Sequence, residues 1–197
     1  MKQILFFCLV FFLILGCKEE QALMPKPRMY PKIEFPAKNY IDFVNNDCNF
    51  TFEIPEYAII EKETEYFDEK PIHPCWFDID IPQLNGKIHC SYFPINNKKE
   101  FEGLVEDAYE FISKHNQKAN YRDEVVIQKP NNVSGIIFEM SGEVATPVQF
   151  YLTDSTQHYL RGSVYFYNQV DPDSMAIVYD FVKEDVAKLI ETFEWND

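Results

Sequence analysis

Few residues of the chain have the types and spacing that catalysis requires. Asp154, Ser155 and His158 supply the side chains of a nucleophilic triad within one short stretch. That stretch is also the turn of a predicted hairpin, where aspartate and serine are common because their side chains bond to the nearby backbone. We therefore expect a structural role for them. The sequence has no GxSxG motif, which acyl hydrolysis by a serine nucleophile commonly uses. It also has no P-loop or GxGxxG motif, which are the common motifs of nucleotide binding.

Metal and acid–base sites are equally weak candidates. The histidines show neither HExxH nor another zinc spacing; they are His73, His89, His115 and His158. His73 and Cys75 lie near Asp78, but nothing close in sequence completes a four-ligand zinc site. Asp78 and Asp80 share one face of a predicted strand, as a carboxylate pair would, although two such acids in an acidic chain are more often solvated. We expect no metal, no cofactor and no enzymatic activity.

The clearest structural signal is a hairpin over Thr146–Asn168, with two alternating strands around the turn Asp154–Gln157. Its even positions are almost all apolar and form one predicted core face: Val148, Phe150, Leu152, Leu160, Gly162, Val164 and Phe166. Its odd positions form a polar, tyrosine-rich face: Gln149, Tyr151, Thr153, Tyr159, Arg161, Ser163 and Tyr165.

Arg161 is the most distinctive residue of the polar face. If Leu152 pairs with Leu160, Arg161 lies opposite Tyr151, and a guanidinium among tyrosine rings can make cation–π contacts and bind a carboxylate. Two roles are open. Arg161 ties a helix or the N-terminal tether to this face, which is the commoner role, or it belongs to a partner-docking surface. The candidate docking residues are Tyr151, Tyr159, Arg161 and Tyr165.

The N-terminus predicts the cellular location. Lys2 precedes the apolar run Ile4–Leu15, which is too short for a bilayer span of roughly 20 residues and so indicates a cleavable signal. Gly16-Cys17 follows, as in bacterial lipoprotein signals. We predict that residues 1–16 are removed and that Cys17 is acylated, because two or three acyl chains anchor a protein durably. The alternative is an ordinary signal peptide with a chance cysteine.

The formal net charge of −14 limits the partners. A chain this acidic lacks the net positive charge that attracts nucleic acid, so we expect no nucleic acid to bind. Anionic headgroups would also repel it, which leaves acylated Cys17 as the contact with the membrane. Aromatic residues make up 16% of the chain and favour a sheet-rich fold.

The rest of the chain reads as a tether followed by one domain. Residues 17–38 contain several prolines, which predict an extended tether. Residues 39–197 form a single α+β domain, with a mostly antiparallel sheet and two long helices packed on it, because strands and helices do not alternate steadily. Besides the hairpin, the predicted strands are Tyr40–Val44, Cys48–Ile54, Tyr57–Glu61, Cys75–Ile81, Lys87–Phe93, Val125–Gln128 and Val133–Met140. The predicted helices are Lys98–Gln117 and Ser174–Trp195.

Three cysteines remain in the predicted mature domain. An odd number outside the cytoplasm suggests one disulfide and one thiol. Cys48 and Cys75 both begin strands with inward-facing residues, so we favour that pair for a disulfide; the alternative is three reduced, buried thiols.

The turn at Asn85-Gly86 bears on the third cysteine. A two-residue turn places Cys90 opposite Ile81, and a five-residue loop places it opposite Asp78. Neither register brings Cys90 opposite Cys75, so a bridge between those two would strain the hairpin.

Two long segments, PVQFYLTDSTQHYLRGSVYFYN and DSMAIVYDFVKEDVAKLIETFEW, resemble the gliding-motility lipoprotein GldD family of Bacteroidetes. PKPRMYPKIEFP, CNFTFEIPEYAII and CWFDIDIPQLNGKIHCSYFP support the resemblance. It implies a membrane-anchored, extracytoplasmic component of gliding and of the linked type IX secretion apparatus, whose partners are other proteins of those complexes. It implies no catalytic residues. Family members resemble this chain at Cys48 and Cys75, which agrees with the favoured disulfide, whereas Cys90 is unmatched.

The order of elements, with FxFxIP early and LIETF at the end, is also similar to the PsbP/Mog1-like α+β sandwich. That similarity implies a binding or scaffold role. We therefore expect a non-enzymatic docking protein. The alternative is an envelope protein that binds or hydrolyses a small ligand in a pocket near Arg161 or His158. Lys18-Glu19-Glu20 resembles an acidic signal for export to the cell surface, but the periplasmic side suits a gliding component better.

Overall fold

The structure is a computed structural model that describes residues 33–62, 70–116, 118–167 and 172–196. The predicted signal peptide and Cys17 lie outside these residues. The compact unit spans Glu34–Asp197. The predicted tether therefore ends earlier than residue 38, because Phe35 stacks on Phe181 with ring centroids 4.5 Å apart. None of the helices in the described ranges combines the length and the apolar character that a bilayer span needs.

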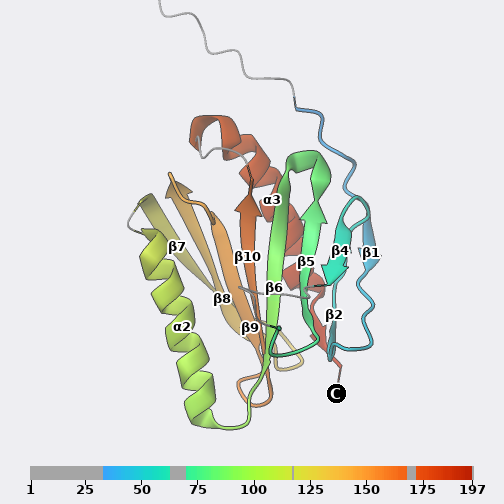
Figure 1. Ribbon diagram of the computed structural model, residues 1–197, viewed down its shortest axis with the longest axis vertical. Coiled ribbons are helices and arrows are strands. Elements are labelled where there is room, and N and C mark those ends of the chain that lie inside the picture. The colour runs from blue at the N-terminus through green and yellow to red at the C-terminus, as the bar shows by residue number, and fades with distance from the viewer. Residues whose placement is uncertain (1–32, 63–69, 117, 168–171, 197) are drawn as a thin grey trace, which may run out of the picture. The chain divides into compact units, whose positions relative to one another are not determined.

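A seven-stranded antiparallel sheet forms the centre of this unit, in the order β4-β5-β6-β10-β9-β8-β7. Figure 1 shows β4 and β7 at opposite edges. The strands are β4 (Ile59–Lys62), β5 (Trp76–Ile81), β6 (Gly86–Pro94), β7 (Ala119–Gln128), β8 (Ser134–Gly142), β9 (Val148–Thr153) and β10 (His158–Phe166). The predicted fold class, α+β with a mostly antiparallel sheet and two long helices, is confirmed.

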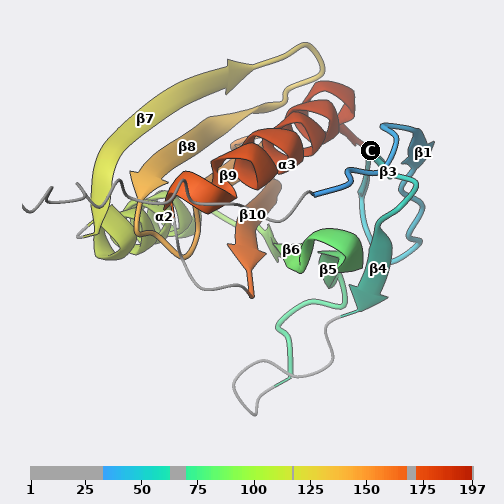
Figure 2. The same cartoon turned by 90° about the horizontal axis from the view of Figure 1, so that it is seen from above.

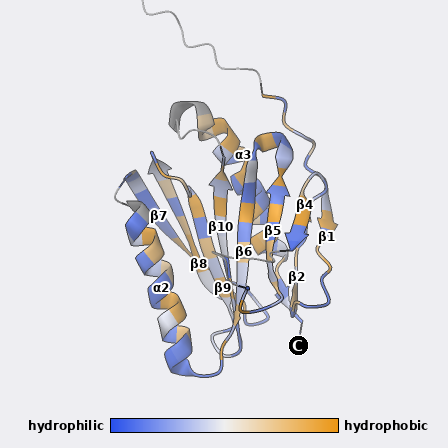
Figure 3. Cartoon of the chain, in the orientation of Figure 1, coloured by the Kyte–Doolittle hydropathy of each residue, from blue (hydrophilic) through white to orange (hydrophobic). Residues whose placement is uncertain are grey.

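The two helices are α2 (Lys98–Asn116) and α3 (Pro172–Thr192). Asn97 begins α2 as a capping residue: its Oδ1 accepts the Glu100 backbone N–H at 3.1 Å, and its amide donates to the Glu100 carboxylate at 2.8 Å. Figure 3 shows apolar and polar residues side by side along α2, as in an amphipathic helix. The predicted second helix, Ser174–Trp195, began two residues too late and ended three residues too late, because α3 ends at Thr192 and the chain continues as a short strand.

Two small antiparallel pairs complete the fold. β1 (Tyr40–Asp42) pairs with β3 (Glu53–Pro55), and β2 (Phe50–Thr51) pairs with the C-terminal β11 (Glu194–Trp195). The predicted strand Cys48–Ile54 is thus two strands that pair with different partners. The pairing of β2 with β11 holds the C-terminal residues against the N-terminal part of the domain.

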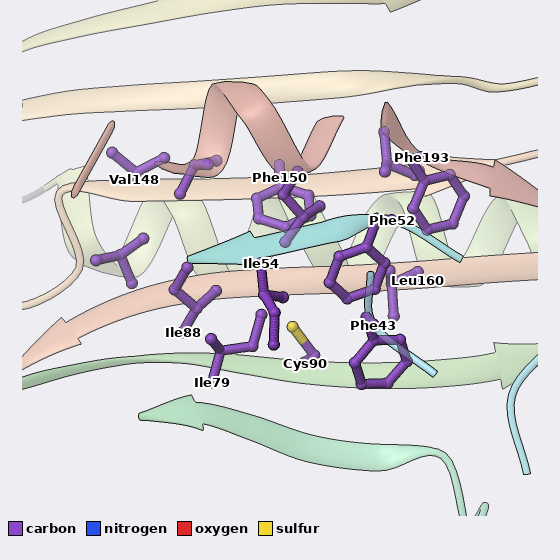
Figure 4. Packing of buried hydrophobic residues seen from close by; sticks show 14 of the residues in the cluster. Phe43, Phe52, Ile54, Ile79, Ile88, Cys90, Val148, Phe150, Leu160 and Phe193 are labelled. Atoms are coloured by element: carbon purple, nitrogen blue, oxygen red, sulfur yellow. The ribbon is translucent and has the colours of Figure 1, made fainter. Parts of the chain in front are cut away.

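Each face of the central sheet packs against a different helix. The larger core joins α3 and the segments around β1, β2 and β3 to the sheet; Figure 4 shows the rings of Phe43, Phe52 and Phe193 gathered at one end of it. The smaller core joins Ala108 and Ile112 of α2 to the opposite face. The sheet therefore has helical cover on both faces (Figure 2).

The hairpin of β9 and β10 has the predicted register, with Leu152 opposite Leu160 and Tyr151 opposite Arg161. Its even positions enter the larger core as predicted. Gly162 is required there, because a Cβ atom at this position would lie 2.1 Å from Cζ of Phe150.

The connection from β5 to β6 differs from both predicted registers. Pro82–Leu84 forms a short 3-10 helix, and Asn85 follows in the left-handed region with φ of 52°. The loop is thus intermediate in length between the two alternatives, and Cys90 lies opposite Phe77. Cys90 is a buried thiol in the larger core.

Candidate functional site

The predicted docking surface on the hairpin is covered by α2. Tyr159 is 1% exposed and Tyr151 is 7% exposed, and their rings stack with centroids 5.2 Å apart. The Tyr159 hydroxyl donates to the Leu104 backbone carbonyl in α2 at 3.2 Å. The prediction of an exposed tyrosine surface was therefore wrong, because these rings form the sheet's contribution to the smaller core.

Arg161 and Tyr165, the other two predicted docking residues, are half-buried. The Arg161 guanidinium lies over the ring of Phe111 in α2, 3.9 Å from its centroid. Its Nη2 donates to Gln149 Oε1 at 3.2 Å. These contacts fit the structural alternative, in which Arg161 ties a helix to this face.

The candidate triad does not assemble. Asp154 Oδ1 accepts the backbone N–H groups of Thr156, Gln157 and His158 at 2.8–3.0 Å, so its carboxylate organises the turn. Burial opposes ionisation, but these bonds and the Thr156 hydroxyl lower the Asp154 pKa overall. His158 is buried, and its Nδ1 bonds the Tyr92 hydroxyl at 2.7 Å.

The structure joins Cys48 and Cys75 in a disulfide, the pairing that the sequence favours, with Cα atoms 5.4 Å apart. Cys75 is thereby unavailable to a metal, and His73 Nδ1 accepts the Cys75 backbone N–H at 3.1 Å. Within the described ranges, no group of three or more histidine, cysteine, aspartate or glutamate side chains is placed to hold a metal ion.

Asp78 is on the sheet face opposite the larger core, as predicted, but it is buried rather than solvated. Its carboxylate accepts hydrogen bonds from Lys87 Nζ and, at 2.6 Å, from His89 Nδ1. Burial works against the charged form, yet the bonds from His89 and Lys87 lower the Asp78 pKa. The partners of Asp78 are thus basic side chains of β6, and Asp80 is half-buried farther along β5.

A second buried carboxylate, which the sequence did not single out, lies on α3. The Asp185 side chain is fully buried and accepts hydrogen bonds from Lys38 Nζ at 2.7 Å, from the Tyr40 hydroxyl at 3.0 Å and from the Tyr57 hydroxyl. Lys38 Nζ also lies 3.7 Å from the centroid of the Phe181 ring. We call Lys38, Tyr40, Tyr57 and Asp185 the Asp185 cluster; it fastens the start of the domain to α3.

Because of the Asp185 cluster, we predict that the folded protein loses stability at high pH. Burial first, and then the hydrogen bond to the carboxylate, raise the pKa of Tyr40 and of Tyr57 above the ordinary value of about 10. Above about pH 10 the unfolded chain therefore binds fewer protons than the folded one, and the free energy of unfolding must fall as the pH rises. Urea unfolding between about pH 8 and pH 11.5 measures this fall.

The matched comparison is a Tyr40→Phe/Tyr57→Phe variant. It should lose stability less steeply above about pH 10, because the remaining buried tyrosines still contribute but these two do not. If the free energy of unfolding falls equally steeply with pH in the two proteins, ionisation of neither hydroxyl is coupled to unfolding.

The longest exposed stretch of the sheet is β7, an edge strand of 10 residues, most of which are exposed. Val126 on the α2 side is 74% exposed, and Tyr121 and Val125 on the α3 side are 62% and 46% exposed. Figure 2 shows β7 as the curved outermost strand. We call β7 with these side chains and Asp123 the β7 edge. The sequence predicted a strand only over Val125–Gln128; the signal that could have extended it is Tyr121, which lies four residues before Val125 and therefore on the same face of a strand.

Two surface hollows adjoin the β7 edge, one on each face of the sheet. The hollow on the α2 side has a volume of about 300 Å³, and its lining includes Val126, Phe101 and Tyr151. The hollow on the α3 side has a volume of about 220 Å³ and is lined in part by Tyr121 and Tyr179. Glu139 and Lys183, which also line the α3-side hollow, form an ion pair with each other.

Comparisons with known proteins agree with this fold. A protein family described as "Gliding motility lipoprotein GldD" matches residues 20–195. No curated protein matches the chain in sequence. Among solved structures, the cyanobacterial PsbP (CyanoP) from Synechocystis sp. PCC 6803 is similar, with a TM-score of 0.50 and 11% sequence identity over 81% of this chain and 94% of that one. At this identity the similarity shows the fold alone, which is PsbP-like.

Proposed function

This chain belongs to the gliding motility lipoprotein GldD family, and from that premise we propose that it is a non-enzymatic docking protein of the gliding machinery and of the linked type IX secretion apparatus. Its family places it at a membrane of the cell envelope as a lipoprotein. In the proposal, acylated Cys17 is the anchor, the domain lies on the periplasmic side, and other proteins of the two complexes are its partners.

The observation that carries the docking role is the β7 edge. Exposed apolar side chains that lie together on a folded domain mark contact surfaces, since isolated ones are common but clustered ones are not. Tyr121, Val125 and Val126 lie within one strand and beside two hollows. The alternative, a ligand-binding or hydrolytic pocket near Arg161 or His158, has less support, because His158 is buried against Tyr92 and Arg161 is packed on Phe111.

Chemical crosslinking in the native membrane, followed by mass spectrometry, tests the proposed function. We expect the full chain to be crosslinked to components of the gliding or secretion machinery. A Cys17→Ala chain, which cannot be acylated at that position, should lose these crosslinks and the membrane fraction together. Recovery of no such component from the unaltered chain would refute the docking role.

A further inference from the structure

We propose that β7 is an acceptor strand, to whose free edge an extended, basic segment of a partner protein adds as a further strand of the sheet. This inference rests on the proposed docking function and specifies its mode. The sheet order places a neighbour on only one side of β7 within the described part of the chain. The outer side of an edge strand offers backbone N–H and C=O groups at every second residue, which is the template that strand addition uses.

The two edges of the sheet differ in how well they suit this role. β7 has 10 residues and pairs with β8 from Ala119 to Gln128, with one register shift between Ala119 and Tyr121. β4 at the opposite edge has 4 residues. A longer ladder gives more main-chain hydrogen bonds to an added strand, so β7 is the better acceptor.

On both faces of the sheet, β7 also has exposed side chains that an added strand could contact. Val126 shares its face with Ile136 in the cross-strand pair, and Val125 shares the other face with Ile137. The side chains of an incoming strand alternate in the same way, with period two. Those on one face would contact Val126 and the α2-side hollow, and those on the other would contact Tyr121, Val125 and the α3-side hollow. Pockets for alternate side chains supply the specificity of this binding mode.

Charge identifies the kind of segment. Arg122 is paired with Glu124 at 2.8 Å, and Lys183 is paired with Glu139 beside the α3-side hollow. Asp123 and Asp180 have no ion-pair partner in the part of the chain that the structure describes, and both are exposed. The surface therefore keeps a negative charge within a chain of net charge −14, which favours lysine or arginine in the incoming strand.

The same charges argue against a second copy of this chain as the occupant. A two-fold antiparallel pairing of β7 with itself places the central residue opposite its own copy. For registers centred on the middle of the strand that residue is Arg122, Asp123 or Glu124. Like charges directly opposite each other are destabilising, and two chains of charge −14 repel.

Site-specific photo-crosslinking of the full chain in its native membrane tests the proposal. A photoreactive phenylalanine analogue replaces Tyr121 or Val125, one at a time, and mass spectrometry locates each attachment. Because the two positions are on one face, we expect attachments to one partner segment rich in lysine or arginine, displaced from each other by about four residues. The same analogue at Ile59, which is 53% exposed on β4, is the matched control and should not attach to that segment.

A charge-reversal variant tests the role of charge by its effect on the crosslinking yield. Asp123→Lys should lower the yield of attachment at Val125 by roughly five- to tenfold, because it turns a favourable cross-strand charge pair into an unfavourable one. Glu61→Lys, a charge reversal at a residue of β4 that is also exposed, should leave the yield unchanged. Both side chains are exposed, so unaltered thermal unfolding of the variants shows that the fold is intact.

Attachment to a second copy of this chain, attachments without a common register, or equal yields from the two charge variants would overturn the proposal. If chemical crosslinking recovers gliding or secretion components while the β7 positions attach to none of them, strand addition fails but the docking function stands. If chemical crosslinking recovers none of them, the proposed function fails first.

Discussion

Asp185→Ala is expected to lower the free energy of unfolding by about 3 kcal/mol. The side chain is fully buried and accepts hydrogen bonds from one ammonium group and two tyrosine hydroxyls, so its removal leaves a charge and two donors without their acceptor. The expected loss is at the lower end of the range for broken buried ion pairs. The reason is that Lys38 is partly exposed and has Glu184 within 3.6 Å as a second partner. Urea unfolding at neutral pH measures the change.

Asp180→Ala is the matched control for this substitution. Asp180 is an exposed aspartate on the same helix, and its loss should change the free energy of unfolding by no more than about 0.5 kcal/mol. Equal effects of the two substitutions would show that the Asp185 cluster contributes no more than helix propensity does.

Reduction of the Cys48–Cys75 disulfide is expected to lower the free energy of unfolding by about 3.5 kcal/mol. The bond closes a loop with a sequence separation of 27, and the loss of unfolded-state entropy on closing such a loop corresponds to that amount. The measurement is urea unfolding of the oxidised protein with and without a thiol reductant.

A Cys48→Ser/Cys75→Ser variant controls for other effects of the reductant. It should unfold like the reduced protein, and the reductant should not change it further, since Cys90 is a free thiol. Non-reduced tryptic peptides should contain a fragment that joins residues 48 and 75. An unfolding midpoint that does not respond to the reductant would contradict the prediction.

Local sequence pattern was sufficient to predict the β9–β10 hairpin. Its alternation fixes which side chains face the core, and the turn residues Asp154–Gln157 fix where the strands reverse, so the register with Leu152 opposite Leu160 followed. The apolar stripe of α2 likewise marked that helix to within one residue at its end. Both features depend on residues that are close together in the chain.

The features that the sequence did not reveal depend on distant residues. Lys38 and Asp185 are 147 positions apart, and each alone resembles an ordinary charged residue of a tether or of a helix surface. The polar face of the hairpin resembled a solvated surface, but tyrosine has a large apolar ring, and α2 covers two of these rings. Nothing in the local pattern states which helix covers which face.

The β7 strand was predicted too short for a related reason. Arg122, Asp123 and Glu124 lower the apparent strand propensity of its first half. Edge strands commonly carry such charges, because they discourage indiscriminate pairing with other chains. The pattern of an edge strand thus differs from that of a central one, and the difference becomes interpretable only when the sheet order is known.

The Asp185 cluster has a mechanical consequence. If the chain is anchored at Cys17 and docks a partner as we propose, tension between the anchor and the partner enters the domain at Phe35 and Lys38. The stacking of Phe35 on Phe181 and the bond from Lys38 to Asp185 pass that load to α3, whose far end continues into β11 and its pairing with β2. Force applied to the N-terminal segment would thus load α3 before it loads the hydrogen bonds between β1 and β3.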